Sequence, residues 1–403
     1  MLGTPLNFEV FLLQDLIHRS AINTPQAIAL VSEEQCLTYQ QLNDFVNSVA
    51  QGFSDLGVKR LVRVGIFLEK CPEFVIAAFA TAKVGGVFVP INPMLKSSQI
   101  LHILNDCNVE VLITSTERLP IVESVFSHCN NLKTIVLKGS EEATTHVQKK
   151  FVRWASLAKS MSYNGQHFGI DSDVVSIFYT SGSTGRPKGV VLSHRNMVMG
   201  ARSVASYLEN NQNDILLAAL PFSFDAGFSQ LTTGFFSGAR IVLENYLTPH
   251  DLQRSIISHS ITGITAVPPL YMQLITIDWP KSVSGHLRYF ANTGGKMPGE
   301  VLKKLRSIFP DSTPYLMYGL TEAFRATFLD PSQVDKRPDS IGKSIPNSEV
   351  LVLNEAGAEC GPGEVGELVQ RGALVSLGYW NDEARRGKPR SFMGSGGPFV
   401  GLI

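Results

Sequence analysis

The stretch YTSGSTGRPKG occupies residues 179–189 and follows the apolar run VVSIF. Three of its residues are glycines, four are serines or threonines, and one is Lys188. Glycines let the backbone approach a ligand and point successive N–H groups at an anion, while hydroxyls and a lysine add donors and positive charge. The stretch therefore predicts a phosphate-binding loop. The alternative is a Gly/Ser turn that only joins two strands.

The spacing of this loop differs from that of a Walker loop. In a Walker loop, four residues separate the first glycine from a Gly-Lys pair that Ser or Thr follows. Here Pro187 precedes the lysine and Gly189 follows it. A Walker-type GTP- or ATP-hydrolysing switch is therefore the weaker interpretation, and another phosphate chemistry is expected.

Apolar strands alternate with helical patterns on both sides of the loop. Thr38 precedes the helical pattern at 39–57, which predicts a capped helix, and the alternation continues from 62 to 115 and from 215 to 295. Strands that are apolar on both faces are typical of parallel sheets covered by helices. We therefore expect an α/β fold, and after Pro331 short strands with turn signals predict a small β unit.

The composition limits the class of partner. Lys+Arg 35 against Asp+Glu 35 leaves no net charge over the 403 residues, so no nucleic-acid partner is expected. The apolar segment 74–91 is interrupted by Lys83 and by Gly85-Gly86, which favours a buried helix and strand over a membrane span. The five cysteines show no CxxC spacing and the N-terminus lacks the basic start of a signal peptide, so a reducing, cytoplasmic location is expected.

Residues 179–196, YTSGSTGRPKGVVLSHRN, resemble the phosphate-loop signature of the AMP-forming adenylating enzymes, which include acyl-CoA synthetases and amino-acid adenylation domains. Other stretches resemble further family motifs in the expected order, among them LTYQQLN at 37–43, GGVFVPINP at 85–93, TAVPPL at 265–270, NTGGKMP at 292–298 and YGLTEA at 318–323. The resemblance implies two α/β subdomains to about residue 330 and a small β subdomain at about 331–382, together forming an AMP-binding N-terminal domain, 1–382.

The resemblance also implies the chemistry. A carboxylic acid would be activated by ATP and Mg²⁺ as an acyl-adenylate and transferred to coenzyme A or to the phosphopantetheine thiol of an acyl or peptidyl carrier protein. Lys188, Thr321 and Glu322 would be catalytic, Thr321 at the α-phosphate and Glu322 on Mg²⁺. The resemblance implies that the nucleotide is bound by Thr180, Ser181, Gly182, Ser183, Thr184, Gly185, Lys188, Gly294, Gly295, Lys296, Tyr318, Gly319 and Thr321.

These roles fit the reaction. Attack of a carboxylate on a phosphate brings two anions together, so catalysis depends on positioning and on cationic and donor groups. A carboxylate nucleophile is already ionised near neutral pH and needs no base, so His194 is expected to be structural. Taken alone, Thr321 and Glu322 would be interpreted as a helix start with an acidic first turn.

The prediction of the acid-binding residues is based on the stretch PFSFDAGFSQL at 221–231. Phe224 and Asp225 stand where many fatty-acyl members carry a histidine. The pair resembles amino-acid-activating members, in which the aspartate holds the substrate ammonium, and also a bacterial acyl-CoA ligase subgroup associated with exosortase gene clusters. The alternative is that Asp225 only caps a helix at 226–236. Phe228 is a candidate for the substrate pocket wall, with plain core as its alternative.

The tail at 383–403 departs from the family. In the family, this point is followed by a strand that carries a ribose-binding aspartate. A hinge and a small C-terminal lid domain with a lysine come next. Here the sequence reads ARRGKPRSFMGSGGPFVGLI from 384, so we expect the lid domain to be absent and activity to be impaired. The main hypothesis is an acyl-CoA synthetase-like ligase of small carboxylic acids. The alternatives are an amino-acid-adenylating domain, or a non-catalytic nucleotide- or partner-binding module.

Overall fold

The computed structural model describes residues 9–33, 35–139, 149–157, 163, 165, 169–180, 187–280, 283, 285–382 and 399–401. They form two compact units. The first contains the chain up to Arg195 with the segments Pro221–Phe224 and Tyr379–Asn381, and the second contains the rest. Each unit has a mainly parallel sheet with helices, and the second also carries a small β sheet, so the predicted fold class is confirmed.

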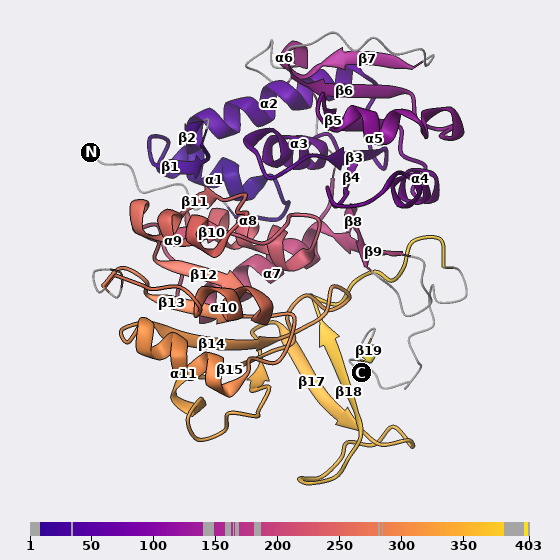
Figure 1. Ribbon diagram of the computed structural model, residues 1–403. Helices are drawn as coiled ribbons and strands as arrows, with labels where there is room; N and C mark the ends of the chain where they lie inside the picture. Colours follow the sequence, from indigo (N-terminus) through magenta and orange to yellow (C-terminus); the bar gives the residue numbers. More distant parts are fainter. Residues whose placement is uncertain are drawn as a thin grey trace, which may run out of the picture. The chain divides into compact units, whose positions relative to one another are not determined.

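The first unit has a sheet with the strand order β7–β6–β5–β3–β4–β8–β9 (Figure 1). Neighbouring strands are parallel except for β8 and β9. Its strands are β3 Arg63–Phe67, β4 Val87–Pro90, β5 Val111–Ser115, β6 Thr134–Lys138, β7 Lys150–Arg153, β8 Val174–Thr180 and β9 Lys188–Ser193. The unit also contains the hairpin β1 Ile28–Val31 and β2 Cys36–Thr38, and the helices α1 Asp15–Asn23, α2 Tyr39–Asp55, α3 Pro72–Lys83, α4 Ser97–Asp106, α5 Leu119–Glu123, η1 Phe126–His128 and α6 Trp154–Leu157.

Local sequence signals account for several of these elements. The Thr38 side chain accepts a hydrogen bond from the Gln41 N–H, and the Gln41 side chain accepts one from the Thr38 N–H, so α2 begins with a capping box. The apolar segment 74–91 forms α3, a turn and β4, all largely buried, as predicted. Within the described ranges, no helix has the length and apolar character needed to cross a membrane.

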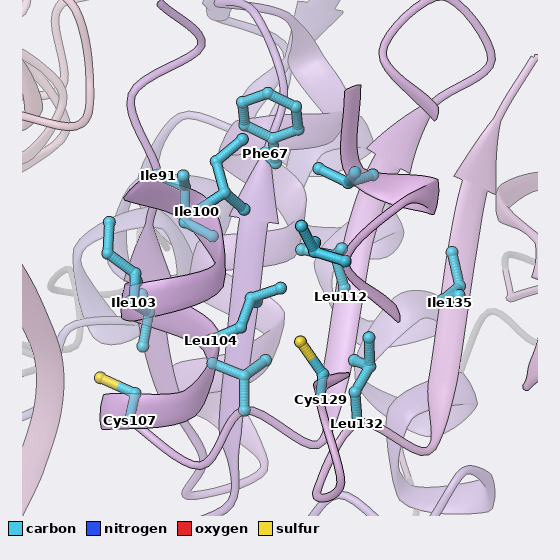
Figure 2. Close-up of a cluster of buried hydrophobic side chains, with 14 of the residues drawn as sticks. Phe67, Ile91, Ile100, Ile103, Leu104, Cys107, Leu112, Cys129, Leu132 and Ile135 are labelled. Atoms are coloured by element: carbon cyan, nitrogen blue, oxygen red, sulfur yellow. The ribbon is translucent and has the colours of Figure 1, made fainter. Parts of the chain in front are cut away.

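One hydrophobic cluster of the first unit lies between α4 and the sheet. Ile100, Ile103 and Leu104 of α4 belong to one buried cluster with Leu112 of β5 and Ile135 of β6 (Figure 2). The cluster also contains Cys107 and Cys129, whereas Cys36 is exposed and Cys71 and Cys360 are partly exposed; all five cysteines are free. Because α4 is anchored here, the residues at its C-terminal end have a defined position against β8.

The sheet of the second unit has the strand order β11–β10–β12–β13–β14–β15–β16. The strands are β10 Ile215–Ala218, β11 Arg240–Leu243, β12 Gly263–Ala266, β13 Tyr289–Asn292, β14 Thr313–Tyr318, β15 Thr327–Leu329 and β16 Lys343–Ser344. The helices are α7 His194–Tyr207, which begins at the boundary between the units, α8 Asp225–Ser237, α9 Pro249–Ser258, α10 Pro268–Leu274, α11 Gly299–Ile308 and the short η3 Pro331–Gln333. Strands β10 to β14 are parallel, so their carboxyl ends share one edge.

Within these mainly parallel sheets, antiparallel pairs occur at two places. Strand β8 pairs with β9, and β14 with β15 and β15 with β16, in antiparallel fashion. The segments that join β8 to β9 and β14 to β15 are shorter than the dozen or so residues that a parallel crossover requires. Both short connections carry predicted nucleotide-binding residues.

The small β sheet consists of β17 Ser348–Leu353, β18 Glu367–Gly372 and β19 Phe399–Gly401, paired antiparallel in this order. Strands β17 and β18 lie in the predicted β unit. Strand β19 comes from the tail at 383–403. Residues 383–398, 402 and 403 of that tail lie outside the described part of the chain.

Candidate functional site

The predicted phosphate loop lies between two paired strands. Thr180 is the last residue of β8 and Lys188 the first of β9, and the two are direct partners across the antiparallel pair. The Lys188 ammonium lies 5.6 Å from the centre of the Tyr379 ring, a cation–π distance. The predicted phosphate-binding residues between them, Ser181, Gly182, Ser183, Thr184 and Gly185, lie outside the described residues.

Tyr379 and Trp380, which lie far along the sequence, contact the first residues of β9. The backbone N–H of Trp380 donates a hydrogen bond to the Gly189 carbonyl at 2.7 Å, and Tyr379 forms an antiparallel β-bridge with Val190. Space around Gly189 is tight, because a Cβ there would lie 2.6 Å from Cγ2 of Ile177. Only glycine fits this close approach.

Tyr179, the first residue of the signature, anchors β8 to the end of α4. Its hydroxyl donates a short hydrogen bond to the Asp106 carboxylate and lies 3.2 Å from the Cys107 sulfur. Burial, then the neighbouring thiol and the Asp106 carboxylate, raise the pKa of Tyr179, and burial raises the pKa of Cys107 to about 12. Both groups therefore stay protonated near neutral pH, and they hold the strand rather than transfer protons.

Asp106 is also hydrogen-bonded to the two residues that follow Tyr379. Its carbonyl accepts from the Trp380 indole at 2.8 Å and from the Asn381 amide at 2.7 Å. The motifs in the sequence do not predict a position for Trp380 and Asn381 at this strand. Nothing in their spacing indicates a contact with Asp106, because more than 270 residues separate them.

In the second unit, three predicted motifs start at neighbouring strand ends. Ala266 at the end of β12 is paired with Asn292 at the end of β13, and Asn292 with Leu316 of β14. The stretches 265–270, 292–298 and 318–323 therefore leave the sheet at the same edge. In open α/β sheets, ligands bind outside this edge.

The loop after β13 contains the residues predicted for the adenine. The Asn292 amide donates to the Gly295 carbonyl at 2.7 Å, which fixes the turn through Gly294 and Gly295. The Lys296 ammonium lies 2.6 Å from Asp339 in an exposed ion pair. The backbone turn therefore forms as the motif predicts, whereas the lysine side chain is directed to a surface carboxylate.

The loop after β14 brings together Tyr318, Gly319, Thr321 and Glu322. Tyr318 ends the strand half-buried, and burial raises its pKa, so its phenol is neutral. Gly319 lies against the backbone of Phe324, where a Cβ would overlap the carbonyl oxygen. The Glu322 carbonyl accepts from the Ser376 N–H at 2.8 Å. The loop is a tight turn of fixed shape rather than the start of a helix.

Asp225 contacts this turn directly. The Thr321 hydroxyl donates to one oxygen of the Asp225 carboxylate at 2.9 Å, and the Arg325 guanidinium donates to the other at 3.0 Å. Helix α8 begins at Asp225 itself. Neither interpretation of Asp225 from the sequence, an ammonium contact or a helix cap, included this buried ion pair with Arg325.

The two phenylalanines predicted at the substrate differ in exposure. Phe224 is 46% exposed, whereas Phe228 in α8 is fully buried. His194, expected to be structural, is buried and accepts a hydrogen bond from the Leu13 N–H at 3.0 Å. The substrate roles of Phe224 and Phe228 stay predictions.

The donor set around Glu322 fits a magnesium ion of the nucleotide-bound kind. Among the described residues, no three carboxylate, histidine or cysteine side chains are gathered into a cluster that could hold a metal alone. Mg²⁺ usually keeps several waters and uses one or two protein carboxylates together with substrate phosphates. A single glutamate beside a hydroxyl-bearing turn is sufficient for that mode of binding.

Comparisons with known proteins agree with these motifs. A family model described as AMP-binding enzyme matches residues 17–380. Malpinin synthetase of Mortierella alpina is 28% identical over 378 residues, which are 92% of this chain and 5% of that protein. The chain thus spans only a small part of this relative's length.

Two solved structures resemble the chain over most of its length. VinN in complex with L-aspartate has a TM-score of 0.80 at 25% identity, covering 92% of this chain and 91% of VinN. The anthranilate CoA ligase AuaEII in complex with anthranoyl-AMP has a TM-score of 0.86 at 23% identity, covering 98% of this chain and 76% of that one. The likeness to AuaEII shows a shared fold.

Proposed function

The chain belongs to the AMP-binding enzyme family, and we propose that it activates a small carboxylic acid as an acid–thiol ligase of the AMP-forming type. One oxygen of the acid would attack the α-phosphorus of ATP, forming an acyl-adenylate as the bond to pyrophosphate breaks. The acyl group would then pass to a thiol, with AMP as the leaving group.

The observation that carries the proposal is the base of the phosphate loop. Thr180 and Lys188 are direct partners where β8 ends and β9 begins, at the two ends of the signature stretch. The residues between them in the sequence include glycines and hydroxyl side chains, the groups that bind phosphate oxygens. Lys188 adds a positive charge at one end of the stretch, where it would bind the outer phosphates of ATP.

The other residues that the resemblance assigns to the nucleotide belong to the second unit. The turns after β13 and β14 would hold the adenine, with Gly294, Gly295 and Tyr318 against the base. Thr321 would donate to an α-phosphate oxygen, and Glu322 would hold Mg²⁺. When bound, the ion neutralises charge on the phosphate oxygens.

The thiol acceptor is proposed as coenzyme A or the phosphopantetheine arm of a carrier protein. The resemblance to amino-acid adenylation domains supports a carrier, and the name of the anthranilate CoA ligase AuaEII supports coenzyme A. The structure of this chain favours neither.

Amino-acid adenylation is the second candidate, and Asp225 is the observation that favours it. The Asp225 carboxylate at the start of α8, hydrogen-bonded to the proposed α-phosphate residue Thr321, would accept a substrate ammonium in addition to its contact with Arg325. VinN, which resembles this chain, was solved with L-aspartate.

ATP–pyrophosphate exchange tests the proposal. The chain would be incubated with ATP, Mg²⁺, labelled pyrophosphate and a panel of aliphatic, aromatic, dicarboxylic and amino acids. We expect label to enter ATP only when an accepted acid is present, because acyl-adenylate formation is reversible. Dependence on amino acids alone would support the second candidate. ATP binding without exchange for any acid would contradict the proposal and favour a non-catalytic nucleotide-binding module.

A further inference from the structure

We propose that Tyr379 is a positioning residue that holds the ammonium of Lys188 where the outer phosphates of ATP would bind. The inference rests on the proposed function, since it concerns the lysine assigned to those phosphates. It starts from a residue to which the motifs assign no role, because the Lys188 ammonium lies 5.6 Å from the centre of the Tyr379 ring. Both residues belong to the first unit.

The register of the strands explains this contact. Strand β9 is the last strand in the sheet of the first unit, and its Val190 pairs with Tyr379 in an antiparallel β-bridge. Lys188 lies two residues before Val190, so the two side chains point to the same face of β9. Diagonal neighbours on one face of an antiparallel pair are about 7–8 Å apart, within reach of an aromatic ring and a long side chain. The bridge therefore brings the ring to the lysine.

Gly189 and Trp380 fix this register between the two contacting residues. The backbone N–H of Trp380 donates a hydrogen bond to the Gly189 carbonyl at 2.7 Å. A Cβ on Gly189 would lie 3.2 Å from the Cβ of Trp380 and closer still to Ile177, so a glycine is needed for this approach. Because the hydrogen bond sets which residue lies opposite Val190, a shift of one residue would turn the Tyr379 ring away from Lys188.

Asp106 anchors the same segment on its other side. It is the last residue of α4, and the last carbonyls of a helix have no partner within that helix. The Asp106 carbonyl accepts a hydrogen bond from the Trp380 indole at 2.8 Å and one from the Asn381 amide at 2.7 Å. Trp380 also packs against the buried cluster that contains Ile103 of α4. Tyr379 is therefore attached to a fixed part of the first unit.

An aromatic ring suits this purpose better than a carboxylate. The face of the ring attracts an ammonium through its quadrupole without forming an ion pair, so the three N–H donors of the lysine are left for phosphate oxygens. Lys296 shows the contrasting arrangement, since its ammonium lies 2.6 Å from the Asp339 carboxylate. The lysine stem is flexible, so a contact that already restricts it reduces the entropy lost when ATP binds.

Nucleotides with and without outer phosphates separate this role from general support of the fold. The probes are AMP and α,β-methylene-ATP, which cannot be cleaved between the α- and β-phosphates. Isothermal titration calorimetry of the full chain with Mg²⁺ gives their dissociation constants. Tyr379→Leu removes the ring but keeps apolar bulk. We expect it to weaken binding of α,β-methylene-ATP about 5-fold, the effect of losing a partly exposed cation–π contact, and to leave AMP binding unchanged.

Two aromatic variants connect the effect to the face of the ring. Tyr379→Phe keeps that face and should bind both nucleotides as the unaltered chain does. Tyr379→pentafluorophenylalanine keeps the shape of the ring but withdraws electron density from its face, so it should weaken binding of α,β-methylene-ATP as the leucine variant does. This variant also keeps the inference testable if leucine prevents folding.

A double variant and a control complete the set. In Lys188→Met, which no longer carries the ammonium, a further Tyr379→Leu change should have no effect on α,β-methylene-ATP binding. Tyr163→Leu is the matched control, because it removes the ring that lies 5.9 Å from the Lys83 ammonium in the same unit. It should bind both nucleotides as the unaltered chain does.

The possible outcomes are distinct. Equal weakening of both nucleotides by Tyr379→Leu would overturn the inference, because the ring would then support the nucleotide site as a whole. Unchanged α,β-methylene-ATP binding in the leucine and pentafluorophenylalanine variants, with weaker binding in Lys188→Met, would overturn it and leave the proposed function intact. If the unaltered chain binds neither nucleotide, or if Lys188→Met binds α,β-methylene-ATP as tightly as the unaltered chain, the phosphate-binding role of Lys188 fails and this inference with it.

Discussion

Replacing Lys188 by alanine is expected to lower the rate of ATP–pyrophosphate exchange by about 100- to 1,000-fold, the usual effect of removing a group that stabilises transition-state charge. Lys188 carries the only positive charge that the described residues place at the base of the phosphate loop, next to Thr180. The reaction brings a carboxylate against a polyphosphate, so loss of this charge affects both ATP binding and the chemical step.

The fold should tolerate the change. Lys188 is half-buried, and its described packing is the contact with the Tyr379 ring, an interaction worth about 0.5–1 kcal/mol. Lys303→Ala, which removes an exposed lysine of α11, is the matched control and should leave exchange unchanged. An exchange rate in Lys188→Ala within a few-fold of the unaltered chain would contradict the assigned role, provided that both proteins unfold at the same temperature.

Breaking the Asp225–Arg325 pair is expected to have the largest effect on stability. Asp225→Ala leaves a buried guanidinium without its carboxylate, and loss of one partner of a buried ion pair costs about 3–5 kcal/mol. This is a large fraction of the usual 5–15 kcal/mol of total stability. The free energy of unfolding from urea titration, followed by circular dichroism, measures the change.

A double-mutant cycle separates the pair from its surroundings. Asp225→Ala/Arg325→Met removes both charges and should be destabilised by much less than the sum of the single variants. The exposed pair Arg306–Asp335 is the control, for which about 0–1 kcal/mol is expected. If the losses of unfolding free energy in Asp225→Ala and Arg325→Met instead add up to the loss in the double variant, the two charges do not stabilise each other.

The parts of the fold that could be predicted depend on local sequence. The capping box of Thr38 and Gln41 joins residues three apart, and the helix–turn–strand at 74–91 follows from its apolar pattern and Gly85-Gly86. The antiparallel pairing of β8 with β9 was missed. Apolar strands indicate burial on both faces, but they do not give the direction of the neighbouring strand.

The same limit applies to the candidate site. The residues proposed for the phosphate loop and for the turn after β14 could be named as candidates because each motif is a short, continuous stretch, and their roles stay predictions. The partner of Asp225 could not, because Arg325 lies 100 residues away and no spacing rule links them. The contacts of Asp106 with Trp380 and Asn381 were missed for the same reason.

The most direct test of the central claim follows an oxygen atom. The chain would react with ATP, Mg²⁺, coenzyme A and an accepted acid that carries ¹⁸O in its carboxylate, and the AMP would be examined by mass spectrometry. If the acid attacks the α-phosphorus, the bridging oxygen of the acyl-adenylate comes from the acid and remains with AMP when the acyl group leaves. We predict one ¹⁸O in the AMP phosphate for each turnover. Unlabelled AMP, or ADP as the nucleotide product, would contradict the assignment of this chain as an adenylate-forming ligase.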